Sequence, residues 1–125
     1  MKAENIKFKA KRLDGKGWAI GDLLHSYENG AIIVPIEGGG AFSVDHSTVC
    51  QFTGDNDMNC NEIYIGDIIS NLETGSIIEV TCNERLKRLD CKFLNADKGL
   101  EVPFGIIVSR YKRIVIVGNK FDKKK

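Results

Sequence analysis

The feature of this chain that most restricts its fold is the alternation of short apolar runs with turn-forming residues. The runs are rich in β-branched and aromatic residues and include IKFKAK, WAIGDLL, AIIVPI, TVCQF, YIGDII, SIIEVTC, DCKFL, VPFGIIV and RIVIV. Turn signals such as Asp14-Gly15, Asn29-Gly30 and Thr74-Gly75 separate them. Short runs bounded in this way are typical of β-strands. The sequence therefore predicts a mainly β protein, a small pseudo-barrel or sandwich of short antiparallel strands.

One segment departs from the strand pattern. In CNERLKRLDCKF, Leu86, Leu89 and Phe93 recur at helical spacing, and Asn83 is a suitable N-terminal cap. This pattern predicts at most one short helix, around residues 83–93. A loop that leads into a strand at LDCKFL explains the same residues equally well, and the sequence leaves both alternatives open.

The length of 125 residues is that of one domain, large enough to bury a core without metal or disulfide bonds. We expect a single domain over residues 1–119 and a basic, frayed tail over residues 120–125. No apolar run approaches the roughly 20 residues that a membrane-spanning helix needs. The first residues also lack the apolar segment of a secretory signal. We therefore expect a cytoplasmic protein that does not contact a membrane.

The cysteine and histidine positions do not predict a metal site. The four cysteines lie 10, 22 and 9 residues apart and form no C-x-x-C pair, and His25 and His46 are distant from each other. Free cysteines behave as small apolar residues and are often buried. We expect that behaviour for Cys50, Cys60, Cys82 and Cys91, and we expect no cofactor.

Charge is distributed unevenly along the chain. Residues 1–16 carry six basic and two acidic side chains, residues 17–84 carry eleven acidic and no basic ones, and residues 85–125 carry twelve basic and four acidic ones. We expect the fold to interleave these segments, because small β domains pair distant strands. If the segregation survived folding, acidic and basic faces would favour head-to-tail assembly.

The stretch QFTGDNDMNCNEIYIGDIIS concentrates acidic and amide side chains between two apolar runs. Asp55, Asp57, Asn59 and Asn61 alternate as in a calcium loop, but the glycine and the glutamate that such a loop requires are absent. Asp and Asn side chains also bond to nearby backbone and so favour chain reversal. We therefore interpret the stretch as a turn between strands, with its carboxylates in water. Gly66 is expected to adopt a conformation that only glycine tolerates.

Three blocks of the sequence resemble the YopX family of small phage and prophage proteins. They are IKFKAKRLDGKGWAIGDL near the start, QFTGDNDMNCNEIYIGDII in the middle and IVIVGNKFD near the end. Together they span nearly the whole chain in the order that the family shows. The matching residues, which we expect to be structural, are Trp18, Gly21, Thr53, Gly54, Tyr64, Gly66, Asp67, Gly118 and Asn119.

The resemblance implies a mostly β, pseudo-barrel-like fold and a viral or prophage origin, and the family has no established activity to carry over. Two positions depart from the family pattern. Asn61 stands in place of the turn glycine, and Ile65 replaces an acidic residue before Gly66. Asn tolerates the left-handed conformation, so we expect the turn to remain intact with Asn61 in it. The missing carboxylate weakens any metal or catalytic role.

The sequence contains no P-loop, no G-x-S-x-G and no H-E-x-x-H motif. We therefore expect a non-enzymatic β module that binds protein. It would act either by assembling into a homo-oligomer or by docking on a host or phage protein in the cytoplasm of a bacterium.

Two alternatives stay open but are not favoured. Nucleic-acid binding would use Phe8, Trp18 and Tyr111 to stack on bases. Its cations would be Lys9, Lys11, Arg12, Arg85, Lys87, Arg88, Arg110, Lys112, Arg113 and Lys123 to Lys125. A metal-dependent enzyme would be built on Asp55, Asp57, Asp67 and one histidine, for which the sequence offers no readable ligand set.

Overall fold

The computed structural model describes residues 7–25, 30–35, 38, 40–86, 88–95 and 101–122. They belong to two compact units, Met1–Gly54 and Asp55–Lys125, and their strands make two antiparallel sheets of six and five strands. The predicted mainly β class is confirmed, although neither sheet closes into a barrel in the described part of the chain. The single domain over residues 1–119 stays a prediction, because compactness does not report whether a unit folds independently.

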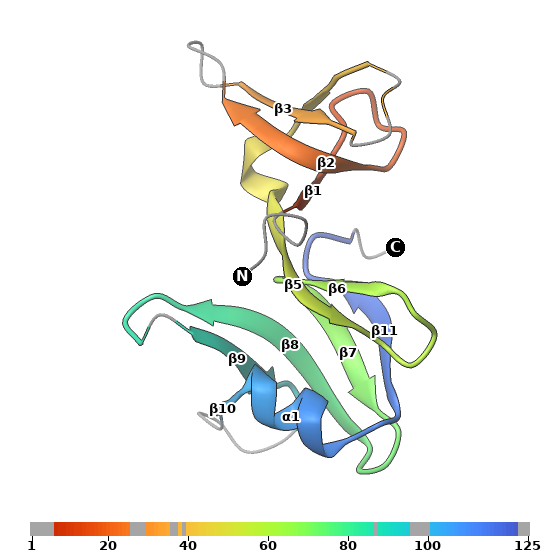
Figure 1. Ribbon diagram of the computed structural model, residues 1–125, viewed down its shortest axis with the longest axis vertical. Helices are drawn as coiled ribbons and strands as arrows, with labels where there is room; N and C mark the ends of the chain where they lie inside the picture. The colour runs from red at the N-terminus through yellow and green to blue at the C-terminus, as the bar shows by residue number, and fades with distance from the viewer. Residues whose placement is uncertain are drawn as a thin grey trace. The chain divides into compact units, whose positions relative to one another are not determined.

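The first unit is a meander of four short strands followed by a 3₁₀ turn and a fifth strand. Its elements are β1 (Phe8–Lys11), β2 (Trp18–His25), β3 (Ala31–Val34), β4 (Phe42–Val44), the 3₁₀ turn η2 (His46–Thr48) and β5 (Cys50–Asn56). Each of β2, β3 and β4 pairs with the strand before it, and β5 returns to β1, so that the order is β4-β3-β2-β1-β5 (Figure 1). A bridge between Arg12 and Val44 also connects β4 with the end of β1.

Alternation along the strands directs one side of this sheet into a small core. The buried residues of the core are Ala10, Ala19, Ala31, Ile33 and Val44. Gly21 follows Ala19 on the same side of β2. A Cβ built at Gly21 would stand 2.2 Å from the carbonyl oxygen of Val34, which is far inside van der Waals contact. Glycine is therefore required where β2 passes the end of β3.

The second unit is a five-stranded sheet with one helix. Its elements are β6 (Glu62–Tyr64), β7 (Asp67–Asn71), β8 (Ser76–Asn83), β9 (Arg88–Phe93), β10 (Glu101–Pro103), α1 (Phe104–Arg110) and β11 (Ile114–Asn119). The sheet has the order β10-β9-β8-β7-β11, and β6 belongs to the other sheet beside β5. Among the described residues, no helix is long and apolar enough to cross a membrane.

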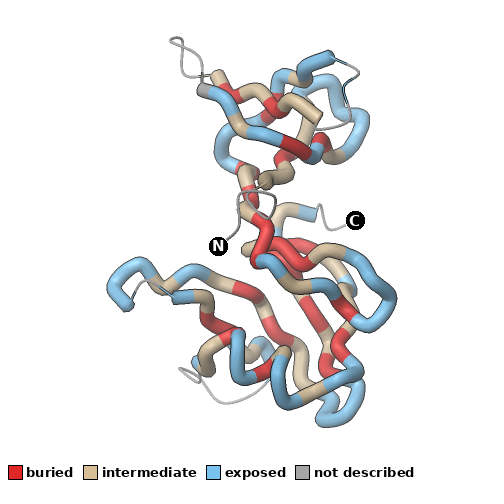
Figure 2. The backbone as a smooth tube through the Cα atoms, viewed as in Figure 1, coloured by how far each residue is buried: buried red, intermediate tan, exposed pale blue. Residues whose placement is uncertain are grey.

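Helix α1 covers one face of this sheet (Figure 1). Phe104 and Ile107 lie one turn apart on the helix and are buried against the sheet residues of the core. Those sheet residues are Ile69, Ile78, Val80, Cys91 and Ile114, and Ile63 of β6 belongs to the same core. Figure 2 shows buried residues along the middle of β7 and β8 and exposed ones at the turns, so the core lies between the sheet and the helix.

The predicted helix around residues 83–93 is wrong, and the alternative strand is confirmed. Residues Arg88–Phe93 form β9, which pairs with β8 from Asn83 to Ile78. Leu86 is 53% exposed, so the helical spacing does not mark a buried face. The helix lies instead in VPFGIIV, which we expected to be a strand. There, burial of Phe104 and Ile107 against the sheet outweighs the strand preference of the β-branched residues.

Opposite charges lie on neighbouring strands in the second unit, in line with the expected interleaving. Lys92 on β9 stands opposite Glu79 of β8 on one side and Glu101 of β10 on the other. Residues 1–54 contain six basic and six acidic side chains, and residues 55–125 contain twelve basic and eleven acidic ones. Each unit is therefore close to neutral, despite the segregation along the sequence.

Replacing Gly21 by alanine should destabilise the first unit by about 3 kcal/mol or more, because the new Cβ cannot avoid the Val34 carbonyl without moving β3. Trp18 is the chain's one tryptophan, so its fluorescence during urea unfolding reports on this unit. Gly105→Ala is the matched control, since nothing lies within 4 Å of its Cβ position. An unchanged midpoint for Gly21→Ala would contradict the close approach.

Candidate functional site

The acidic stretch forms the turn between β5 and β6, as predicted, and Asp57 organises it. Its Oδ1 accepts hydrogen bonds from the backbone N–H groups of Asn59 and Asn61, both at 2.9 Å. The N–H of Asp57 donates to the carbonyl of Asn61 at 2.8 Å. The left-handed residue of this turn is Cys60, with φ of 65°, and not Asn61 as we expected. The turn is thus fixed around one carboxylate.

The same loop reaches the edge strand β11. Oδ2 of Asp57 accepts the N–H of Ile116 at 3.0 Å, and the N–H of Met58 donates to the carbonyl of Ile114 at 2.8 Å. β11 is the last strand of its sheet, and unpaired backbone groups on such an edge favour association with other chains. The loop therefore satisfies edge groups of β11 that would otherwise be open to pairing.

Asp57 and Asp67 are buried, which corrects our expectation that the carboxylates of this stretch stay in water. Asp57 is 6% exposed and Asp67 is 0% exposed. Burial by itself would raise the pKa of Asp57, but hydrogen bonds from the N–H groups of Ile116, Asn61 and Asn59 outweigh it and hold the pKa below its usual value. Backbone donors thus replace water around the charge, and their hydrogen bonds offset the free-energy cost of burying it.

Asp67 connects β7 with two other segments of the second unit. Its Oδ2 accepts the N–H of Tyr64 at 2.7 Å, and its Oδ1 accepts Nδ2 of Asn119 at 2.9 Å. Asn119 in turn accepts the N–H of Phe121 on its Oδ1 at 2.8 Å, and its own N–H donates to Asp122 at 2.9 Å. The first residues of the expected frayed tail are therefore hydrogen-bonded, while residues 123–125 lie outside the described part.

The family-motif residues divide between the two units. Trp18 and Gly21 lie on β2, and Thr53 and Gly54 lie on β5. The others gather around the bond between Asp67 and Asn119: Tyr64, Gly66, Asp67, Gly118 and Asn119. Gly66 has φ of 101°, so the expected special conformation is confirmed. In the second unit these motif residues surround the hydrogen bonds of Asp67 that connect β6, β7 and β11.

The structure also buries polar residues that sequence reasoning missed. Asp90 on β9 is 0% exposed and accepts hydrogen bonds from Arg88 Nε at 2.7 Å and Asn83 Nδ2 at 3.0 Å. Glu73 is exposed, but sequence reasoning missed it as well: one of its oxygens accepts the backbone N–H groups of Lys112 and Arg113, at 2.8 and 3.3 Å. The only signal in the sequence was a polar residue beside an apolar run, which is common at exposed positions too.

A metal centre is not formed by the candidate residues that the structure describes. Within that part of the chain, no three His, Cys, Asp or Glu side chains lie close enough together to hold a metal ion. Asp57 and Asp67 instead use their oxygens for backbone and amide donors. Asp55 lies on β5, and His46 lies in η2 of the other unit.

The four cysteines are free, but only two of them are buried. Cys50 and Cys91 are buried, whereas Cys60 and Cys82 are exposed, so the expected burial holds for half of the set. Burial, together with the nearby Asp90 carboxylate, raises the pKa of the Cys91 thiol to about 12. Cys91 is therefore protonated at neutral pH and chemically inert.

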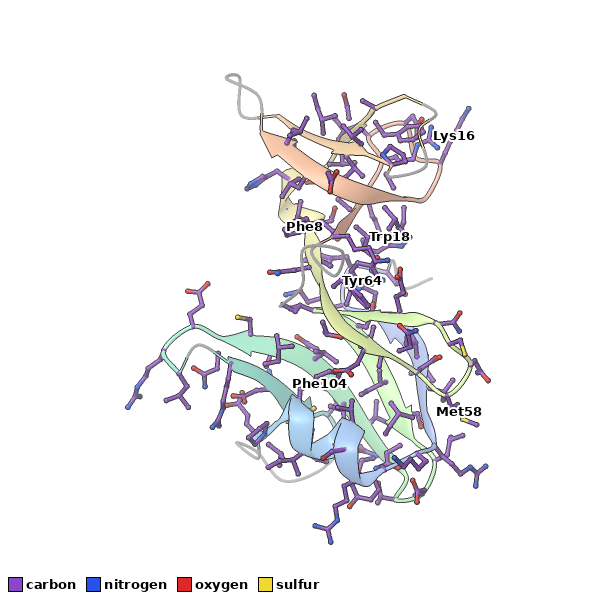
Figure 3. The ribbon with its side chains drawn as sticks, viewed as in Figure 1. Phe8, Lys16, Trp18, Met58, Tyr64 and Phe104 are labelled. Atoms are coloured by element: carbon purple, nitrogen blue, oxygen red, sulfur yellow. The ribbon has the colours of Figure 1, made fainter. Side chains whose placement is uncertain are left out.

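The side of the first sheet that faces away from its core carries a row of apolar residues and lysines. Ile20 and Leu24 on β2 are 45% and 54% exposed. The rest of this open face, as we call it, comprises Lys9 and Lys11 of β1, Trp18 of β2, and Ile32 and Val34 of β3. Trp18, labelled in Figure 3, has the Lys9 and Lys11 ammonium groups 4.8 and 5.6 Å from the centre of its ring.

No protein-family model matches the chain, and none of the curated proteins matches it. The YopX resemblance accordingly stays a prediction that rests on the three sequence blocks.

Replacing Asp57 by asparagine should lower the free energy of unfolding by about 2 kcal/mol at neutral pH, because an amide nitrogen cannot accept the N–H bonds of a buried carboxylate. The folded-state pKa of Asp57 is depressed, so its contribution is complete above the unfolded value of about 3.9. It is lost as the pH falls through the folded-state pKa.

Urea unfolding followed by circular dichroism, at neutral pH and in acid, measures this difference. Wild type and Asp57→Asn should converge in acid, whereas Glu84→Gln, an exposed acid in the same unit, should match wild type throughout. A difference between wild type and Asp57→Asn that persists unchanged in acid would show that the carboxylate charge is not responsible.

The native protein should show two fast and two slow thiols towards an aromatic disulfide reagent. Cys60 and Cys82 are accessible, whereas Cys50 and Cys91 become reactive only when the chain unfolds. Mass spectrometry of the labelled peptides identifies which thiols react first. Early labelling of Cys91 would contradict its position in the core.

Proposed function

We propose that this protein is a non-enzymatic binding module that self-associates through the open face of its first unit. The observation that carries the proposal is the exposure of Ile20 and Leu24 on a sheet whose other side already forms the core. Contiguous apolar surface of this kind is characteristic of interaction sites. Two sheets pack well face to face at a separation of about 10 Å.

The charge distribution favours a two-fold contact over head-to-tail assembly. Head-to-tail assembly would need an acidic face and a basic face, and the near balance of acids and bases within each unit removes that reason for it. On the open face, Lys9 and Lys11 of β1 stand opposite Ile20 and Trp18 of β2, and Asp22, which is exposed, follows Ile20 on the same side of β2. In a two-fold pair, the lysines of one copy would approach the aspartate of the other.

Nucleic-acid binding remains the alternative and is less well supported. In the described first unit, cations lie over three aromatic rings: Lys9 and Lys11 over Trp18, Lys7 over Phe52 and Arg12 over Phe42. However, Ile20, Leu24, Ile32 and Val34 offer aliphatic surface, which phosphates and bases do not require. Binding to phosphates must weaken steeply with salt. A gel shift that shows retardation at low salt would favour this alternative.

The carboxylate chemistry does not support a metal-dependent enzyme. Asp57 and Asp67 lie in the same unit, but their oxygens are engaged by donors that fix the fold. A phage or prophage origin and a place in the bacterial cytoplasm are part of the proposal, and their support is the YopX resemblance.

Light scattering over a range of concentrations should show a dimer that dissociates when Leu24 is replaced by aspartate. A charge in the middle of the apolar contact cannot be desolvated without a large cost. Leu86→Asp is the matched control, because Leu86 is exposed to the same degree, 53% against 54%, but lies in the second unit. A wild-type protein that is monomeric at every concentration and salt level would refute self-association.

A further inference from the structure

The second unit has a surface groove beside the loop that Asp57 organises. A groove of about 160 Å³ opens between this loop and the segment that connects α1 with β11. Its apolar walls are the side chains of Met58, Val108, Tyr111 and Ile114. Met58 is 46% exposed and stands at the tip of the loop (Figure 3). The groove is therefore open to solvent, and its lining is mixed, because Asn56, Asp57 and Lys112 line it as well.

The size of the groove selects one side chain rather than a small molecule. Sites for drug-sized molecules usually have volumes of about 300–1,000 Å³. A cavity of about 150 Å³ accepts a benzene ring. The groove thus matches a phenylalanine or a branched aliphatic side chain that a partner inserts.

The lining of the groove contains one cation, Lys112, and one acid, Asp57. Arg110 and Arg113 adjoin lining residues in the sequence. All three cations are exposed, and none of them forms an ion pair with a described residue. The nearby acids are Asp57 and Glu73, and both are engaged by backbone N–H groups. Lys112 and the two arginines of the same segment are therefore free to pair with the carboxylates of a partner.

The residue types at this surface are those that interfaces favour. Tyr, Met and Arg are enriched in protein–protein contacts, where aromatic residues and arginine contribute most of the binding energy. Met58 adds a flexible thioether that adapts to the shape of an inserted group. The backbone beneath is fixed, because Met58 and Asp57 bond to Ile114 and Ile116.

We infer that this groove binds an acidic segment of another protein, with one aromatic or branched aliphatic residue inserted between Met58 and Tyr111 and flanking carboxylates paired with Arg110, Lys112 and Arg113. The inference is independent of the open face, which belongs to the other unit. A nucleic acid is less suitable, since Met58, Val108 and Ile114 offer no polar group with which to bind a base edge.

Fluorescence anisotropy with labelled peptides tests the inference on the full chain. The probe peptide carries one phenylalanine between aspartates. In the control peptides, alanine replaces the phenylalanine or lysines replace the aspartates. A labelled single-stranded oligonucleotide tests whether a nucleic acid binds instead. We expect saturable binding of the probe only, with an affinity that decreases as salt rises.

Variants locate the site. Lys112→Glu and Met58→Ser should each lower the affinity for the probe peptide about tenfold or more, as expected for the loss of a paired charge or an anchor contact. Arg85→Glu and Leu86→Ser are the matched controls from the exposed β8–β9 turn and should bind as wild type does. Leu24→Asp should also leave peptide binding unchanged, which separates this site from the open face.

Four results would overturn the inference. They are the absence of saturable probe binding, equal weakening by Arg85→Glu, tighter binding of the oligonucleotide than of the probe, and a change of oligomeric state in Lys112→Glu. The last result would mean that a second copy of the chain occupies the groove. Circular dichroism of Lys112→Glu checks that its fold is retained. Met58→Ser tests peptide binding at the same groove without a change of charge.

Discussion

The second unit depends on carboxylates that are buried because backbone N–H groups replace their water. Asp57 joins the β5–β6 turn to β11 through three such donors, and Asp67 joins β6 and β11 to β7. A buried charge without partners would cost several kcal/mol, whereas a charge with this many donors can stabilise the fold. These bonds determine the shape of the turn, the satisfaction of the β11 edge and the position of Met58 beside the groove.

The same bonds show that Asp57 and Asp67 of the acidic stretch contribute to the fold. We therefore look for function on the surfaces of the two units. A carboxylate that already accepts fixed donors has little capacity left for a metal ion or a proton transfer. What remains available is the open face of the first unit, with Ile20 and Leu24, and the groove of the second unit, with Met58 and Lys112. Both are suited to binding partners.

The sequence predicted the mainly β class, because strand alternation and turn signals are local properties of a few residues. It also predicted the turn in the acidic stretch and the special role of Gly66. It did not predict the helix at Phe104, because burial against a sheet decided that segment and the strand propensity of Ile106 to Val108 did not. Nor did it predict that Asp57 is buried, since the donor at Ile116 lies 59 residues away in the sequence. The hydrogen bonds from the N–H groups of Lys112 and Arg113 to Glu73 could not be predicted for the same reason.

Amide hydrogen exchange at Ile116 and Tyr64 tests the central claim most directly, because these two N–H groups donate to the carboxylates of Asp57 and Asp67. Both amides should exchange far more slowly than in an unstructured peptide, because a buried carboxylate accepts each of them. The Ile116 amide should lose its protection when Asp57 is replaced by asparagine. Rapid exchange of both amides in the native protein would show that the carboxylates do not hold these segments together.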